Sequence, residues 1–298
     1  MNVAIHALLL TGYATAVTTA APRLLSRSDL PRRSPALALA LWHISIGCAG
    51  FAIGLAALKL MSAARYLPVG RHDHAITLVE VLSAVLTGLF ITLFFTGRLV
   101  RAAISLWRTR RTTRARHLDL LAVLGHHDPD LDATVIPAPA PAAYCVAGSG
   151  QVVITEDAVK LLEPRQLAAV IAHERAHLAG RHHLLVGWAT LLVEAFPRVP
   201  ALEQLRTATS DLVELLADDS ARRHVDGSAL ATAIGLLGPA APNGSLAATG
   251  GQALVRVERL LEPPPRRWSP LVIAIAALTP LLIGVPLFLA TSPADQLF

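Results

Sequence analysis

The sequence predicts a mainly α-helical membrane protein with four transmembrane helices and an α+β domain between the third and the fourth. Of the 298 residues, 53% are hydrophobic and only 16% are charged, and the mean hydropathy is +0.52. That composition is too apolar for an ordinary soluble protein. The chain also divides into long apolar segments and one extended polar stretch. The two cysteines, Cys48 and Cys145, lie far apart and indicate neither a disulfide framework nor a cysteine metal cluster.

Four apolar segments are long enough to cross a bilayer. They are Val3–Ala21, Ala36–Leu58, Ala75–Gly97 and Trp268–Thr291. Arginines follow the first segment and no Lys or Arg precedes it, which is the reverse of a cleaved signal peptide, so we expect a retained helix. The fourth segment contains three prolines, and we expect it to be kinked.

Arginines next to the spans predict the orientation. The net charge is +5, and the arginines gather in the first connection and at the start of the third, which the positive-inside rule places in the cytoplasm. We therefore expect a multi-pass plasma-membrane protein with both termini outside, and a basic run against anionic lipid headgroups of the bilayer. We read the excess of arginine as a topology signal and expect no direct binding of nucleic acid.

The resulting domains are residues 1–116 with three spans and basic cytoplasmic flanks, residues 117–267 as the cytoplasmic domain, and residues 268–298 with the fourth span and a short outer tail. The cytoplasmic domain is long enough to bury a hydrophobic core. The residue pattern in the first part of this domain predicts a short helix, a polar turn, and three strands in a small antiparallel sheet with a proline-bearing edge. These elements are Leu118–Leu124, His126–Asp130, Thr134–Ile136, Ala143–Ala147 and Gln151–Thr155. Four helices follow, at 184–196 (buried or at the membrane surface), 201–224, 228–237 and 252–261.

The main chemical signal is the sequence His173-Glu174-Arg175-Ala176-His177, an H-E-x-x-H motif. Pro164 suits the first position of a helix, and Gly180 suits its end. Because helix positions i and i+4 share one face, His173 and His177 can bind one metal ion, with Glu174 beside it as general base. Burial of two His and one Glu on an apolar helix would be costly without a metal or other partners.

A third ligand is available downstream in Glu214, which shares a helix face with Asp218. Three protein ligands with one open position are typical of catalytic zinc, so we expect one Zn²⁺ per chain. Asp218 is a candidate for the carboxylate that accepts a hydrogen bond from a metal-bound histidine. Three residues near the end of the same helix are alternatives for stabilising an oxyanion. They are Arg222, Arg223 and His224.

H-E-R-A-H followed by E-x-x-x-D resembles the gluzincin metallopeptidases, and most of all the membrane peptidases of the BlaR/MecR (beta-lactam-sensor) type. The stretches A-A-Y-C-V-A-G and H-E-R-A-H-L-A-G-R-H-H and the layout of spans extend this resemblance over nearly the whole chain. It implies a gluzincin-like peptidase domain, zinc as the metal, Glu174 as the base, and a cytoplasmic protein substrate that is often a BlaI/MecI-like winged-helix repressor. By fold analogy, a strand at Tyr144, Cys145, Val146 and Ala147 would pair with an extended substrate. The chain ends at Phe298, after the fourth span, so we expect no extracellular penicillin-binding sensor domain.

Two other functions remain open. One is a membrane quality-control peptidase resembling the HtpX and prenyl-protein endopeptidase group, which shares H-E-x-x-H and a downstream Glu. The other is a non-enzymatic membrane receptor with a structural zinc site. The span layout and the residues flanking the motif favour the regulatory peptidase, and the intact Glu174 argues against a purely structural site, which needs no base.

Overall fold

A computed structural model of the protein describes residues 2–62, 74–238, 250–262 and 270–291. The first residues of the predicted fourth span, Trp268 and Ser269, and the predicted outer tail lie outside these ranges. In chain order, the elements are α1 (Asn2–Ser26), α2 (Leu30–Arg33), α3 (Pro35–Ser62), α4 (His74–Leu124), β1 (His126–Asp128), β2 (Ala133–Ile136), β3 (Ala143–Cys145), β4 (Val152–Thr155), α5 (Glu156–Leu161), α6 (Pro164–Ala179), α7 (His182–Ala195), α8 (Pro200–Ala221), α9 (Gly227–Leu237), α10 (Gly250–Leu261) and α11 (Pro270–Thr291).

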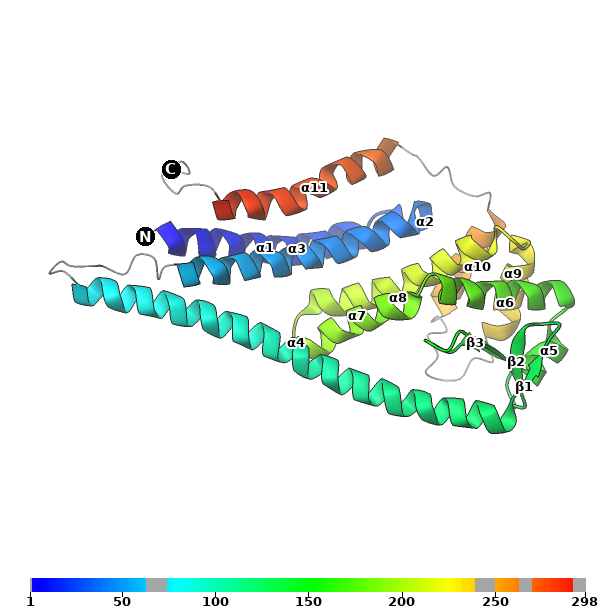
Figure 1. The fold of residues 1–298 in the computed structure, drawn as a ribbon. Coiled ribbons are helices and arrows are strands. Elements are labelled where there is room, and N and C mark those ends of the chain that lie inside the picture. The colour runs from blue at the N-terminus through cyan, green and yellow to red at the C-terminus, as the bar shows by residue number, and fades with distance from the viewer. Residues whose placement is uncertain (1, 63–73, 239–249, 263–269, 292–298) are drawn as a thin grey trace.

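The long apolar helices lie side by side in one half of the molecule, and the sheet with α5 to α10 lies at the other end (Figure 1). In the part of the chain that the structure describes, three helices are long and apolar enough to cross a membrane. They cover Val3–Ser26, Pro35–Ser62 and Leu78–Leu124. The fourth span stays a prediction, because within α11 only Thr279–Thr291 is described as an apolar helix, shorter than a span.

Helix α11 nevertheless packs beside α1 and α3. The Tyr13 hydroxyl in α1 donates a 2.5 Å hydrogen bond to the backbone oxygen of Leu282 in α11. Pro286 stands four residues after Leu282 and has no N–H to donate to that oxygen. Tyr13 therefore satisfies a carbonyl that a proline leaves free, as helices in an apolar environment require.

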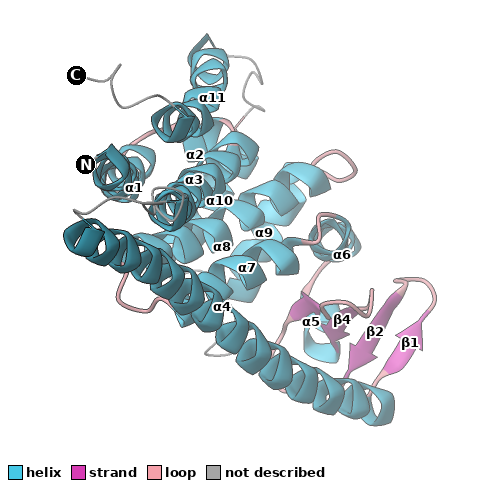
Figure 2. Ribbon diagram, turned by 60° about the vertical axis from the view of Figure 1, so that its left-hand side comes forward, coloured by secondary structure: helices cyan, strands magenta, loops and turns pink. Residues whose placement is uncertain are grey.

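Helix α4 is a single helix of 51 residues, about 75 Å long, that continues from the third apolar segment to the edge of the sheet. A separate helix was predicted at Leu118–Leu124, and that prediction is wrong. No proline interrupts α4, and the glycine that follows Leu124 ends it. Its basic second half therefore lies alongside the globular end of the molecule instead of forming a loop (Figure 2).

The four-stranded sheet has the order β1-β2-β4-β3. Strands β2, β3 and β4 were predicted at these positions, but the sheet is mixed and not antiparallel: β2 pairs with β4 in parallel, with Thr134 opposite Val153. The proline-rich segment after β2 leaves the sheet, and the following β3–β4 hairpin rejoins it with β4 beside β2 and β3 at the edge.

The polar stretch His126–Asp130 was predicted to be a turn, and this is only half right. Residues His126–Asp128 form β1, which is antiparallel to β2. The turn begins at Asp128, whose carboxylate accepts hydrogen bonds from the N–H groups of Asp130 (2.9 Å) and Leu131 (3.2 Å). The two histidines are mostly exposed on the outermost strand and do not belong to the metal-ligating group described below.

The globular end packs directly on the long apolar helices. One buried cluster joins α2 and the first half of α3 to α7 and α8. It includes Leu30, Leu39, Trp42, Leu192, Leu205 and Leu212. A second cluster lies between the sheet and α6 and includes Val135, Ile154, Leu167 and Ile171. Helices α6 and α8, which carry the motifs, are thus each fixed on one face by apolar contacts, and they contact one another.

Candidate metal centre

Helix α6 presents the H-E-x-x-H motif because its ends and its apolar face are well defined. Pro164 occupies the first turn, and the Gln166 side chain accepts a 3.0 Å hydrogen bond from the N–H of Glu163. Leu167, Val170 and Ile171 are buried against the sheet, and Gly180 caps the end as expected. The motif residues therefore lie on a rigid helix that is fixed from below.

The three expected ligands come together. The Nε2 atoms of His173 and His177 lie 3.1 Å apart. Glu214 approaches them from α8, with Oε2 3.4 Å from His173 Nε2 and Oε1 3.3 Å from His177 Nε2. Zinc–ligand bonds of about 2.05 Å in a tetrahedron would place ligand atoms about 3.3 Å apart. The donor set of two imidazoles and one carboxylate thus fits a zinc ion, and these residues could bind a metal.

Glu174 follows the first ligand and is partly buried. Burial is the main cause that raises its pKa, opposed by the neighbouring histidines. The Cys145 thiol at the end of β3 is hydrogen-bonded to the Glu174 carboxylate. Burial of the thiol and, to a smaller extent, the negative charge of Glu174 raise the pKa of Cys145 to about 12. The thiol is therefore a neutral donor that orients Glu174, and not a thiolate ligand.

Asp218 is 1% exposed and lies behind His173, where its Oδ1 is 3.0 Å from His173 Nδ1. The two atoms are within reach of one another, although Nδ1 makes no well-aligned hydrogen bond. This places Asp218 where a carboxylate would hold the Nδ1 proton and leave Nε2 for a metal. Burial lowers the pKa of His173, but the Asp218 and Glu214 carboxylates outweigh burial and raise that pKa to about 9.

Arg256 on α10 joins the two carboxylates. Its Nε and Nη2 donate 2.8 Å hydrogen bonds to the two oxygens of Asp218, and Nη1 lies 2.8 Å from Glu214 Oε2. Asp218 and Glu214 keep the pKa of Arg256 above its usual range despite burial. With the histidine ligands neutral, the carboxylates of Glu174, Glu214 and Asp218 and the guanidinium of Arg256 sum to a charge of −2, which a divalent cation would balance.

His182 supports the second ligand. Its Nδ1 lies 2.9 Å from Nδ1 of His177, and burial lowers the pKa of His182 to about 4, so the ring is neutral. A neutral His182 can accept the Nδ1 proton of His177 and leave the Nε2 of His177 for a metal. The contact depends on Gly180, because a Cβ there would lie 2.3 Å from Nε2 of His182.

The other predicted site residues have different positions. Arg222 donates hydrogen bonds to the backbone oxygens of Arg259 and Glu262, Arg223 donates to Ser220, and His224 is exposed. None of these three contacts the motif in the described structure. Tyr144 and Cys145 lie in β3, which is the edge strand, next to α6, and Val146 and Ala147 follow them.

Sequence reasoning missed Arg256 and His182. Arg256 lies 42 residues after Glu214 on the hydrophilic face of an amphipathic helix, where a lone arginine carries no signal. His182 does carry one, because it stands in the H-E-R-A-H-L-A-G-R-H-H stretch, but its distance from His177 does not match a helical repeat. Because helix α6 ends at Gly180 and the chain turns there, the His182 ring lies next to the ligand His177.

Fold and site together place the H-E-x-x-H helix and the Glu214 helix around one group of residues that could hold a metal, an arrangement similar to that of gluzincin-type metallopeptidases. Residues 107–212 match the model of a family described as Peptidase family M48, which is a gluzincin-type metallopeptidase family. The match covers about a third of the chain, from the last turns of α4 to a point just before Glu214, and it implies a metal-dependent peptide hydrolase. It does not extend to the BlaR/MecR type. Searches of curated proteins and of solved structures found no match.

Proposed function

We propose that this protein is a membrane-embedded zinc metalloendopeptidase that cleaves a cytoplasmic protein and thereby regulates it. The observation that carries the proposal is the triangle of His173, His177 and Glu214 donor atoms, spaced 3.1 to 3.4 Å apart, beside the partly buried carboxylate of Glu174. A structural site would need no base at that position, and its usual four protein ligands are not present among these residues.

His173, His177 and Glu214 would hold the metal. When bound, a zinc ion would act as a Lewis acid that activates water and polarises the scissile carbonyl. Glu174 would take the proton from the attacking water and deliver it to the leaving nitrogen. Its raised pKa suits this exchange, and the Cys145 hydrogen bond holds the carboxylate in place.

The substrate would bind as an extended segment on the free edge of β3. This strand uses one edge to pair with β4, with Tyr144 opposite Val153, and the other edge has no strand partner in the described structure. Because β3 also contacts α6, a peptide added to this edge would pass over Glu174. An exposed linker of a dimeric winged-helix repressor is a substrate of this kind.

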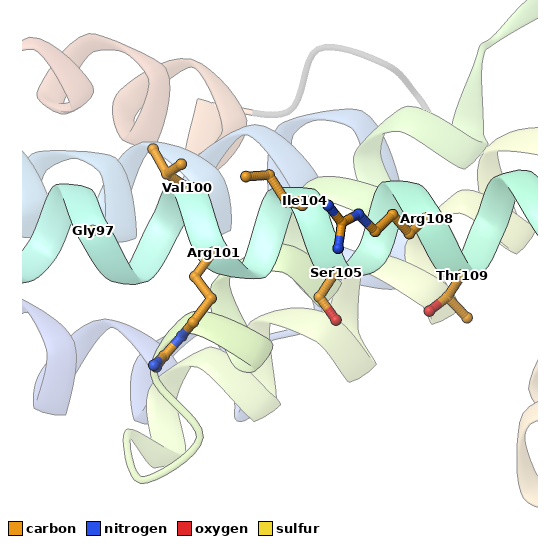
Figure 3. A pocket seen from close by; sticks show the side chains of 7 residues that line it. All are labelled: Gly97, Val100, Arg101, Ile104, Ser105, Arg108 and Thr109. Carbon is orange, nitrogen blue, oxygen red and sulfur yellow. The ribbon is translucent and has the colours of Figure 1, made fainter.

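The basic part of α4 supports a position at the cytoplasmic membrane surface. A shallow groove of about 520 Å³ lies where α4 leaves its apolar stretch. In Figure 3, Val100 and Ile104 lie on one side of the helix, and Arg101 and Ser105 on the other. An apolar side next to a guanidinium and a hydroxyl suits the boundary between acyl chains and anionic headgroups.

Reporter fusions test the orientation. A reporter at the N-terminus and one after Phe298 should be outside the cell, and a reporter inserted at Gly244 should be inside, because the arginine-rich connections stay in the cytoplasm. The measurement is reporter activity on each side of the membrane. A cytoplasmic N-terminus together with an outer C-terminus would leave an odd number of spans and contradict the four-span arrangement.

Helix α10 offers a route for regulation, because it contacts both the first connection and the metal centre. Arg259 donates to the backbone oxygen of Arg32 in α2 (2.9 Å), and Arg32 pairs with Glu258 (3.2 Å). One turn before Arg259 on the same helix, Arg256 holds Asp218 and Glu214. A shift of α2 relative to the membrane would therefore act on the residues behind the ligands. We infer that a membrane or envelope event controls the peptidase by this route.

Co-expression with a candidate winged-helix repressor tests substrate and regulation. Wild-type protein should shorten the repressor under cell-wall stress, and Glu174→Gln should leave it intact, as followed by immunoblot. Equal cleavage in the Glu174→Gln strain would reject the repressor-peptidase function. Cleavage that needs Glu174 but ignores stress would keep the peptidase and remove the signalling role. Glu174-dependent loss of misfolded membrane proteins, with the repressor intact, would favour the quality-control function.

A further inference from the structure

A second pocket adjoins the metal centre. It has a volume of about 500 Å³ and is lined by the turn between β3 and β4 and by the junction of α6 and α7. The lining residues are Gly148, Ser149, Gly150, Leu178, Arg181, His183 and Leu184. Leu178 directly follows the ligand His177, and Gly148 stands three residues after Cys145, which contacts Glu174. Both walls of the pocket thus continue from residues of the metal centre.

The pocket is surrounded by positive charge. Arg181 and His183 line it, and Arg114 of α4 lies against its Gly148 wall, because a Cβ on Gly148 would be 2.8 Å from Nη1 of Arg114. Arg110 lies one turn before Arg114. Burial lowers the pKa of His183, and the charges of the three surrounding arginines lower it further. Arg110 itself lies against α7, because a Cβ on Gly187 would be 2.5 Å from its Nη1, so all three arginines lie on or against elements that border the pocket.

The charge of this cluster is not balanced from within the chain. Among the described residues, no carboxylate lies within 4.0 Å of the guanidinium groups of Arg110, Arg114 or Arg181, whereas Arg175 pairs with Asp132 and Arg206 with Glu203. Arginines gathered around one pocket without a counter-charge produce a field that attracts anions. A guanidinium also binds a carboxylate through two parallel hydrogen bonds.

We propose that this pocket is a specificity subsite that takes an acidic side chain of the peptide substrate. The inference rests on the proposed peptidase function and adds a substrate class to it. In an extended peptide on the edge of β3, alternate side chains point to the same side. A residue a few positions from the cleaved bond would thus reach the pocket beyond Cys145, and the arginines would select Asp or Glu there.

An anionic lipid headgroup is the competing ligand, and the position of the pocket disfavours it. From Gly97, at the end of the apolar stretch, to Arg110 is thirteen residues, or about 20 Å along the helix. The headgroup region of one leaflet is only about 5 to 8 Å thick. The turn of β3 and β4 and the α6–α7 junction also belong to the peptidase core, next to the ligands.

The test uses the full-length protein with zinc in phosphatidylcholine nanodiscs and a fluorogenic peptide selected for Glu174-dependent cleavage. Each position flanking the cleaved bond is occupied in turn by Glu and by Gln. At one position, we expect kcat/KM to be about 10-fold higher for Glu, because the Gln peptide leaves the guanidinium groups unpaired. Arg181→Gln and Arg114→Gln should each reduce this preference to about 2-fold or less, mainly by lowering kcat/KM for the Glu peptide.

Two controls make the result specific. Arg206→Gln removes an arginine from an exposed pair on α8, outside the pocket, and should keep the full preference. Arg181→Lys keeps the positive charge and should retain most of the preference for the Glu peptide. A measurable rate on the Gln peptide shows that a variant is folded, and either pocket variant suffices if the other does not fold.

The failures are distinguishable. Glu174-dependent cleavage with no preference for Glu at any position would overturn the subsite and leave the peptidase intact, as would a preference that survives in both pocket variants. A preference abolished in nanodiscs containing phosphatidylglycerol would assign the pocket to lipid headgroups and overturn the inference. The absence of any cleavage that Glu174→Gln abolishes would overturn the proposed function and the subsite together.

Discussion

Replacing Glu174 with Gln is expected to leave about one zinc ion on each chain and to lower kcat/KM on a cleaved peptide by about 10³-fold. The amide keeps the shape of the side chain but cannot accept the proton of the attacking water. Metal content by mass spectrometry and peptide cleavage measure the two parts separately. Glu203→Gln, at an exposed pair with Arg206, is the matched control and should change neither quantity. Full activity of Glu174→Gln would remove Glu174 from the mechanism.

Substitution of the metal ligands is expected to remove the zinc ion itself, in contrast to substitution of Glu174. His177→Ala, His173→Ala and Glu214→Ala should each release the metal, because two ligands do not complete a zinc site. His182→Ala, which removes the partner of His177, should weaken zinc affinity by about 10- to 100-fold without abolishing it, and Asp218→Ala should behave alike. Competition with a chelator measures the affinity. A full complement of zinc in His177→Ala would disprove the ligand assignment.

Arg256→Met is expected to lower the free energy of unfolding of the metal-free protein by about 3 to 5 kcal/mol. The substitution leaves Asp218, which is 1% exposed, as a buried carboxylate without its bidentate partner. Chemical denaturation in detergent, with zinc removed by a chelator, measures the change. The effect should be among the largest of any single substitution at the site, because the Arg256 side chain is itself only 14% exposed.

A double substitution separates charge from packing. Asp218→Asn removes the buried charge, so the pair Asp218→Asn and Arg256→Met should be more stable than Arg256→Met alone. Arg175→Met is the matched control: it removes an exposed pair with Asp132 and should cost about 1 kcal/mol or less. Equal destabilisation by Arg175→Met and Arg256→Met would show that the buried contact with Asp218 has no special weight.

Local patterns predicted most elements but not their arrangement. Capping and periodicity located α6, α8, α9 and α10 to within a few residues, because these signals act within one or two turns. The continuity of α4 was missed because its charged second half resembles a cytoplasmic loop. The parallel pairing of β2 with β4 was missed because it depends on where the proline-rich connection places the β3–β4 hairpin, which is not a local property.

The sequence by itself determined the candidate ligands and the base. The spacing of four between His173 and His177 fixes one helix face, and Glu214 and Asp218 repeat that spacing, so the donors were identified without a structure. Only the tertiary structure decided what surrounds them. It brought Arg256 to Asp218 from another helix, brought His182 back to His177 after the break at Gly180, and placed three arginines and His183, from α4 and the α6–α7 junction, around one pocket. These contacts join residues that are distant in sequence or that lie on either side of a helix end. Their distances are set by the packing of buried helices and not by the spacing within one helix.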